Sequence, residues 1–217
     1  MAELLETARG PVQVWDEGAG DPVLVVHGSP GGCDQGWLMA QFLLDAGFRA
    51  IIPSRPGYLD TPLTDDNSSI DAQADLHAAT LRALGIDRAA VLCWSGGGPS
   101  TYRLAARHPA MVTAITALAA LSHDYHWELG IDEKFMFGTR AGNHLIALMA
   151  RHAPQQLVSA TLQAEGDLTK DELAELTAHV FADPTKREFV LGLAATVSHR
   201  GNRRDGMEND RATFAAI

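Results

Sequence analysis

The stretch Ala89-Ala90-Val91-Leu92-Cys93-Trp94-Ser95-Gly96-Gly97-Gly98-Pro99 decides the fold. Residues 89–93 form a continuous apolar run, which is typical of a strand that is buried on both faces of a sheet. Three glycines and a proline follow, and the segment as far as Arg107 predicts a helix that stops before His108-Pro109. A buried strand, a sharp turn and a helix therefore meet at one residue, Ser95.

Ser95 stands at the apex of this turn, where its hydroxyl would project from the end of the sheet. Such a turn strains the backbone of its central residue and presses together the residues two before and two after it. Gly97 is small enough for this, and so is Cys93, although glycine is usual at that position. The following helix directs its positive dipole end toward negative charge that develops at the serine. The pattern predicts a nucleophile elbow; the alternative is a serine that only caps the helix.

A second glycine-rich segment, His27-Gly28-Ser29-Pro30-Gly31-Gly32, follows the buried apolar run that begins at Pro22. Its glycines allow the backbone to approach a substrate closely. The segment resembles the oxyanion-hole loop of the α/β-hydrolase superfamily, and this resemblance implies that the backbone amides of Ser29 and Gly96 stabilise an oxyanion. His27 ends the strand, and we expect it to anchor the loop by hydrogen bonds instead of acting as a general base.

A third segment, Ser54-Arg55-Pro56-Gly57-Tyr58, follows the buried strand Arg49–Pro53. In this order the three segments resemble the α/β-hydrolase superfamily, in particular its lid-bearing branch of prolyl aminopeptidases, epoxide hydrolases and haloalkane dehalogenases. The resemblance implies a mostly parallel sheet flanked by helices, with a serine nucleophile at Ser95 and a mainly structural Arg-Pro-Gly turn. Epoxide hydrolases and dehalogenases use an aspartate at the elbow, so the serine favours ester, amide or related acyl transfer.

The alternation of strands and helices predicts an α/β-hydrolase core over residues 1–123, with Val112–Leu121 as its fourth buried strand. A helical lid is expected over 124–206, and residues 207–217 are expected to return toward the core in truncated form. Helical segments are predicted near residues 133–151, 155–164, 169–181 and 184–196. The run Asp167–Glu172 supplies a capping signal for one of them.

The acid and the base that a serine nucleophile requires are missing from their usual positions. In this family the chain order is serine, then aspartate or glutamate, then histidine, and no strand-like run with an acidic turn lies between Asp124 and Ile217. The chain is therefore expected to be a fragment or one half of a split enzyme, lacking its C-terminal strands. Two alternatives stay open: Asp124 and His199 act as acid and base, or the protein is a non-catalytic binder with a degenerate hydrolase fold.

A sheet cut after its fourth buried strand would expose a long apolar edge. We expect a complementary C-terminal fragment, or a second copy in a homo-oligomer, to cover that edge. A small-molecule substrate is expected, and Trp94 beside the nucleophile is a candidate for lining its pocket. The aromatic residues Tyr125, Trp127, Phe135 and Phe137 could line the same pocket or pack the lid against the sheet.

The charge balance excludes some partners, because 17 basic residues stand against 27 acidic ones and the net charge is −10. Nucleic acids and anionic membranes both require clustered lysine and arginine, so neither is expected as a partner. The two cysteines, Cys33 and Cys93, predict reduced thiols and a cytoplasmic location. No metal-ligand spacing or phosphate-binding loop stands out, so no metal and no cofactor is expected.

Overall fold

The computed structural model describes residues 1–126, 139–198 and 203–217. The chain divides into two compact units, Met1–Glu128 with Gly201–Ile217 and Leu129–Arg200. The first unit contains residues 203–206, which the expected boundaries assign to the lid. A covering role for the second unit stays a prediction.

The first unit is built on a six-stranded sheet in the order β1-β2-β4-β3-β5-β6. Its strands are β1 Glu3–Thr7, β2 Gly10–Glu17, β3 Pro22–Val26, β4 Arg49–Pro53, β5 Ala89–Trp94 and β6 Val112–Leu118. The four strands from β3 to β6 run parallel, and the β1–β2 hairpin joins them antiparallel. The predicted α/β class with a mostly parallel sheet is confirmed.

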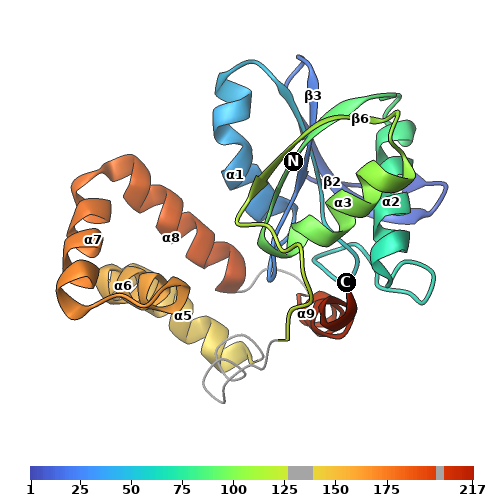
Figure 1. Ribbon diagram of the computed structural model, residues 1–217. Coiled ribbons are helices and arrows are strands. Elements are labelled where there is room, and N and C mark those ends of the chain that lie inside the picture. Colours follow the sequence, from blue (N-terminus) through green and yellow to red (C-terminus); the bar gives the residue numbers. More distant parts are fainter. Residues whose placement is uncertain (127–138, 199–202) are drawn as a thin grey trace. The chain divides into compact units, whose positions relative to one another are not determined.

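Helices cover both faces of this sheet (Figure 1). One face carries α1 Cys33–Asp45, and the other carries α2 Ile70–Ala83 and α3 Gly98–Arg107. The short 3-10 helix η1 Ser95–Gly97 separates β5 from α3, and the chain ends in α9 Arg204–Thr213 and the 3-10 turn η2 Phe214–Ala216. The strand–turn–helix around Ser95 therefore has the form that the sequence predicts.

The second unit is helical in its described part, with α5 Arg140–His152, α6 Pro154–Glu165, α7 Lys170–Ala182 and α8 Pro184–Ser198. These helices lie close to the four predicted spans, although residues 133–138 are outside the described residues. Thr169 caps α7, and its hydroxyl and the Glu172 carboxylate form a reciprocal capping box. The capping signal in the sequence is thereby confirmed.

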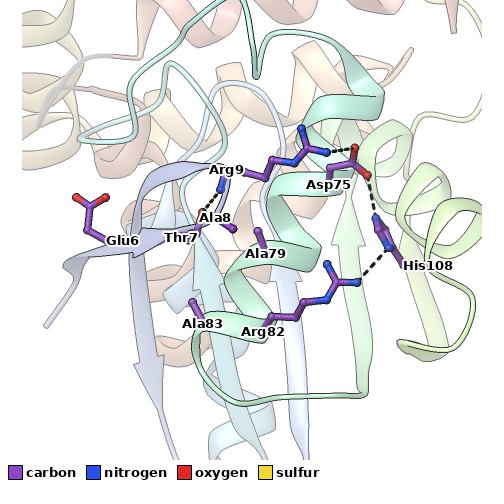
Figure 2. A pocket seen from close by; sticks show the side chains of 9 residues that line it. All are labelled: Glu6, Thr7, Ala8, Arg9, Asp75, Ala79, Arg82, Ala83 and His108. Carbon is purple, nitrogen blue, oxygen red and sulfur yellow. Dashed lines mark hydrogen bonds and ion pairs between the residues drawn. The ribbon is translucent and has the colours of Figure 1, made fainter.

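The strand β1 was not predicted from the sequence. Only one of its apolar residues, Leu5, packs against the core, while Leu4 is exposed and Glu3 and Glu6 interrupt the pattern. An edge strand of this kind gives a weak periodic signal, because packing constrains only some of its positions. The hairpin turn is tied to α2 by an ion pair between Arg9 and Asp75, with 3.2 Å between their nitrogen and oxygen (Figure 2).

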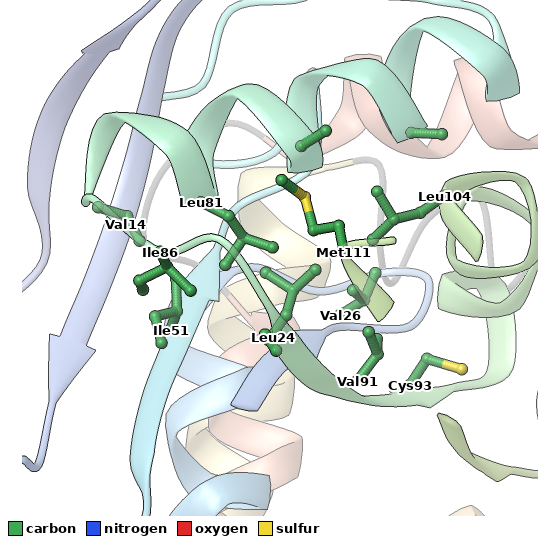
Figure 3. Packing of buried hydrophobic residues seen from close by; sticks show 13 residues of the cluster. Val14, Leu24, Val26, Ile51, Leu81, Ile86, Val91, Cys93, Leu104 and Met111 are labelled. Atoms are coloured by element: carbon green, nitrogen blue, oxygen red, sulfur yellow. The ribbon is translucent and has the colours of Figure 1, made fainter. Parts of the chain in front are cut away.

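The larger hydrophobic core lies between the sheet and the helices α2 and α3 (Figure 3). Leu24 and Ile51 come from the central strands, while Leu81 and Leu104 come from α2 and α3, and all four are fully buried. Burial of a side chain of this size contributes about 1.5–3 kcal/mol each. This packing holds the ends of β3, β4 and β5 together, and the candidate site lies at those ends.

The prediction that residues 112–121 form a buried strand is wrong in this structure. The strand β6 lies at the edge of the sheet and pairs with β5, and six of its seven residues are exposed. Ile115 and Leu118 are 36% and 41% exposed. The apolar sequence of β6 is typical of a strand that is covered on both faces. Among the described residues of its unit, no strand pairs with its outer edge, and most of its side chains are exposed.

A buried histidine makes the stability of the first unit sensitive to acid. His77 on α2 is 2% exposed, and its Nε2 lies 3.2 Å from Ser100 Oγ on α3. Burial, helped by the charge of Arg55, lowers the pKa of His77 from 6.5 to about 3. Below pH 6.5 the unfolded chain therefore binds a proton that the folded chain does not, so stability falls as the pH drops from 6.5 toward 3.

We expect His77→Gln to flatten this acid dependence. Between pH 7 and pH 5 the free energy of unfolding of the variant should fall by about 2 kcal/mol less than that of the original chain. Urea unfolding at the two pH values measures the difference. His123→Gln, at an exposed position, is the control, and an equal acid dependence in all three chains would contradict the assignment.

Candidate active site

Ser95 occupies the first position after β5, and its backbone has a φ of +47°. This left-handed conformation is unfavourable for a residue with a side chain, and it persists only where the surrounding structure enforces it. The residue is exposed, at the carboxyl end of a central parallel strand. Open α/β sheets bind their ligands at these strand ends.

Two glycines allow the elbow to pack closely against the end of β3. A methyl group on Gly97 would lie 2.5 Å from the carbonyl oxygen of Val26 and 2.9 Å from that of His27. A methyl group on Gly28 would lie 3.1 Å from Ser95 Cβ. The loop after β3 and the elbow after β5 are therefore in contact, as the oxyanion prediction requires.

Side chains from other segments donate hydrogen bonds to the loop 27–31, and each residue of the loop accepts one of them. Arg55 donates from Nε to the carbonyl of His27 (3.2 Å) and from Nη2 to the carbonyl of Gly28 (3.1 Å) and to Ser29 Oγ (2.8 Å). Gln35 donates to the carbonyl of Pro30, and Arg203 donates to that of Gly31. Among the described residues, no acceptor is found for the Ser29 N–H.

The positive charge of Arg55 is balanced by Asp210, which lies on α9. Both side chains are 1% exposed, and the guanidinium donates from Nη1 and Nη2 to the two carboxylate oxygens at 2.7 Å each. Tyr58 donates to the same carboxylate at 2.5 Å, and so does the hydroxyl of Ser29. Burial alone would lower the pKa of Arg55, but Asp210 and Tyr58 outweigh it and raise that pKa. The guanidinium of Arg55 therefore stays positively charged and donates several hydrogen bonds at once.

His27 is fully buried beneath this ion pair. Its Nε2 accepts the backbone N–H of Arg55 at 2.8 Å, so the proton resides on Nδ1, which lies 2.7 Å from the carbonyl oxygen of Gly28. Burial and the neighbouring Arg55 hold the pKa of His27 well below 6.5. The expectation that His27 anchors the loop agrees with these contacts.

Asp210 and Phe214 are residues that the sequence reasoning missed. Phe214 lies against Gly96, because a methyl group on that glycine would come within 3.0 Å of its ring. The carbonyl of Phe214 also accepts the N–H of Tyr125 at 2.8 Å. The segment 203–217 therefore contacts both sides of the predicted oxyanion hole, Ser29 and Gly96. A separation of 155 residues between Arg55 and Asp210 left no local signal for this contact.

The structure brings no acid–base pair to Ser95 among its described residues. Asp124 lies beyond the end of β6, where its Oδ1 accepts the N–H of Ile217 at 3.0 Å. His199 lies outside the described residues. None of the described histidines forms a hydrogen bond with Ser95.

One serine that does contact a histidine is Ser100, which faces His77 between α2 and α3. Both side chains are 2% exposed, so a substrate has no access to them. A histidine with a pKa of about 3 is also a weak general base at neutral pH. This pair therefore contributes to helix packing.

The side chain of Trp94 lies beside Gly28, where a methyl group would come within 2.9 Å of its Nε1. The residue is half-buried, and its indole N–H has no acceptor within the described parts of the chain. Trp15 and Trp37, by contrast, both donate to Glu17. Tyr125 is 50% exposed, and the other aromatic candidates, Trp127, Phe135 and Phe137, fall outside the described residues.

A cavity of about 300 Å³ lies elsewhere in the first unit, between the β1–β2 turn and α2 (Figure 2). Of its lining residues, Asp75 contacts Arg9 and His108, and it also contacts Arg107 outside the cavity. Residues 1–126, 139–198 and 203–217 contain no cluster of three or more potential metal ligands. None of their helices is long and apolar enough to cross a membrane.

Comparisons with known proteins agree with this geometry. A sequence profile of the alpha/beta hydrolase fold matches residues 21–179. The chain belongs to this family of enzymes. The structure superposes on an alpha/beta hydrolase fold protein from Nakamurella multipartita with a TM-score of 0.93 and 52% identity, covering 99% of this chain and 74% of that one.

Two curated relatives bear the names of hydrolases. The uncharacterized hydrolase YcgS of Bacillus subtilis is 31% identical over 121 residues, which are 56% of this chain and 41% of that protein. A haloalkane dehalogenase of Psychrobacter cryohalolentis is 30% identical over an alignment that covers all of this chain and 70% of the relative. The chain thus spans less than half of the first relative in this alignment and about two thirds of the second.

We expect Asp210→Ala to destabilise the first unit strongly. Removal of this carboxylate leaves the buried Arg55 without a counter-charge, which costs about 3–5 kcal/mol. Asp16→Ala is the matched control, because Asp16 also binds an arginine, Arg49, with both nitrogens, but in a pair that is 25–29% exposed. The control should lose no more than about 1 kcal/mol. Equal losses in urea unfolding would contradict a special role for the buried pair.

Proposed function

We propose that this chain carries the nucleophile and the oxyanion donors of a serine hydrolase that acts on an ester, amide or related acyl substrate. The observation that carries the proposal is the strained, exposed Ser95 at the end of β5, in contact with the loop after β3. In this mechanism Ser95 Oγ attacks a carbonyl carbon and gives up its proton to a base. The N–H groups of Ser29 and Gly96 stabilise the oxyanion. Its collapse breaks the bond to the alcohol or amine, which leaves with the proton from the base, and water then cleaves the acyl-serine and restores the Ser95 hydroxyl.

The identity of the nucleophile argues against dehalogenation by this chain, although one relative bears that name. An aspartate that displaces a halide forms an ester, which water can cleave at its carbonyl carbon. A serine that displaced a halide would form an ether, which has no carbonyl for water to attack. Attack on an acyl carbon avoids this dead end, because the acyl-serine is itself an ester.

The general base and its orienting acid are proposed to come from a segment outside residues 1–217. The described histidines support this, since their hydrogen bonds go to groups other than Ser95. Asp124 and His199 are the candidates within the chain, and a non-catalytic binder of the same fold is the alternative function. Turnover of an activated ester that disappears with Ser95→Ala distinguishes an enzyme from a binder.

We expect a fluorophosphonate to add once to Ser95 when the base is present. Intact-mass spectrometry of the purified protein should show one adduct on the original chain and none on Ser95→Ala. Ser100→Ala is the matched control, because Ser100 contacts a histidine, His77, and this variant should label like the original chain. A second mass in the spectrum would identify a co-purified fragment that supplies the base. Labelling that survives Ser95→Ala would refute the assignment of the nucleophile.

We also propose that β6 pairs with a strand from a polypeptide segment outside these 217 residues. The strand is exposed along its length and is bonded to β5 on one side. About a quarter of the Nakamurella multipartita protein has no counterpart in this chain, so that relative has additional polypeptide beyond the matched part. An unpaired edge with apolar side chains is a template for such a strand.

This proposal predicts a monomer with an apolar edge that accepts a dye. Light scattering should give the mass of one chain, and an anilinonaphthalene sulfonate dye should fluoresce less with Ile115→Lys or Leu118→Lys than with the original chain. Phe42→Lys, at an exposed apolar residue of α1, is the control for a general change in surface charge. A stable dimer that these β6 substitutions dissociate would assign the edge to a second copy and contradict the proposal.

A further inference from the structure

The buried cluster around Arg55 fixes the orientation of the loop after β3. Arg55 contacts three successive residues of the loop after β3, at the His27 carbonyl, the Gly28 carbonyl and the Ser29 hydroxyl. Its remaining hydrogen bonds go mainly to Asp210, and the ring of Tyr58 lies 5.0 Å from its guanidinium carbon. One rigid cation therefore connects the loop to α9.

The bond to the Gly28 carbonyl determines where the Ser29 amide points. The Gly28–Ser29 peptide is trans, so its carbonyl and its N–H lie in one plane and point in opposite directions. Because Arg55 Nη2 holds the carbonyl at 3.1 Å, the N–H of Ser29 is directed away from Arg55. This N–H is the group that the proposed mechanism assigns to the oxyanion.

The same cluster orients the Ser29 side chain. Its hydroxyl accepts from Arg55 Nη2 and donates to Asp210, so both functions of the hydroxyl are occupied. The hydroxyl proton is therefore unavailable to a substrate oxygen, and the backbone amide is the donor that Ser29 can still offer. Tyr58 supports the arrangement by donating to the same carboxylate oxygen, Asp210 Oδ2.

We propose that Arg55 and Asp210 are positioning residues that aim the Ser29 amide at the reacting carbonyl. The inference rests on the proposed function for its chemical consequence, but the orientation of the loop can be tested without activity. The segment 203–217 makes further contacts of the same kind, since Arg203 donates to the Gly31 carbonyl and Phe214 lies against Gly96.

Two variants separate an effect on the orientation of the Ser29 amide from an effect on the stability of the first unit. Arg55→Lys keeps the positive charge opposite Asp210 but loses the planar fork that reaches several acceptors at once. The double variant Arg55→Met with Asp210→Asn removes both charges together, so no buried charge is left unpaired. The matched control is Arg49→Met with Asp16→Asn, which removes a bidentate ion pair between β2 and β4 that forms no hydrogen bond with the loop.

Two measurements on each folded variant decide the matter. The rate constant for bond formation between Ser95 and a fluorophosphonate should fall about ten- to a hundredfold in both Arg55 variants, while the affinity for the probe changes little. Hydrogen exchange of the amide at position 55, which donates to His27 Nε2 at the start of the loop, should accelerate, with exchange in α2 and β5 unchanged. The Arg49 and Asp16 control should match the original chain in both respects.

The outcomes distinguish the two proposals. If the original chain does not label at Ser95 and no co-purified fragment is present, the base is missing, as the proposed function expects for residues 1–217, and the exchange data alone decide the positioning role. Labelling that survives Ser95→Ala would refute the proposed function without affecting the positioning role. Original rates of labelling and exchange in the folded Arg55 variants would overturn the positioning role. Should those variants not fold, Ser29→Ala leaves the ion pair intact and removes one of the three contacts, and unchanged exchange in that variant would overturn the role as well.

Discussion

The buried ion pair between Arg55 and Asp210 is the constraint on which the rest of this site depends. Transfer of a guanidinium and a carboxylate out of water is expensive, and the pair is tolerable only because nearly every polar group around it is satisfied. The guanidinium has acceptors on the loop and on Asp210, while the carboxylate has donors from Arg55, Tyr58 and Ser29. A pair built in this way specifies one arrangement of its neighbours, because any other arrangement leaves a buried charge without a partner.

This constraint explains why elements that are distant in sequence meet at the carboxyl ends of β3 and β5. The close approach of Gly97 to the end of β3 brings the elbow to the loop, and the ion pair fixes the loop to α9. The strain at Ser95 is sustained by this surrounding structure and by the N–H of Leu121, which binds the Ser95 carbonyl at 2.9 Å. Together these contacts present a serine hydroxyl at the open end of the sheet.

The strand next to β5 has a different character, because it lies at the edge of the sheet. The strand β6 carries a sequence suited to burial, yet in this chain it is an exposed edge. A strand becomes buried only when neighbouring elements cover it. The apolar composition of β6 is therefore suited to a sheet in which such neighbours are present. Membership of the α/β-hydrolase fold family and the greater length of the relatives are consistent with additional polypeptide at this edge.

The sequence by itself determined the class of fold and the positions of the three buried strands β3, β4 and β5. It also located the sharp turn at Ser95 and the glycine-rich loop His27–Gly32 that contacts this turn. These features are local, because apolar runs, glycines and prolines act over a few residues of chain. The sequence did not indicate β1, whose periodic signal is weak. It predicted β6 as a buried strand, although it also indicated an exposed apolar edge beyond that strand. Only the tertiary structure decided that Asp210 balances Arg55, that Phe214 packs on Gly96 and that the hydroxyl of Ser29 is occupied. Those contacts join residues more than a hundred positions apart, and one sequence contains no local pattern that specifies which distant charge will neutralise a buried arginine.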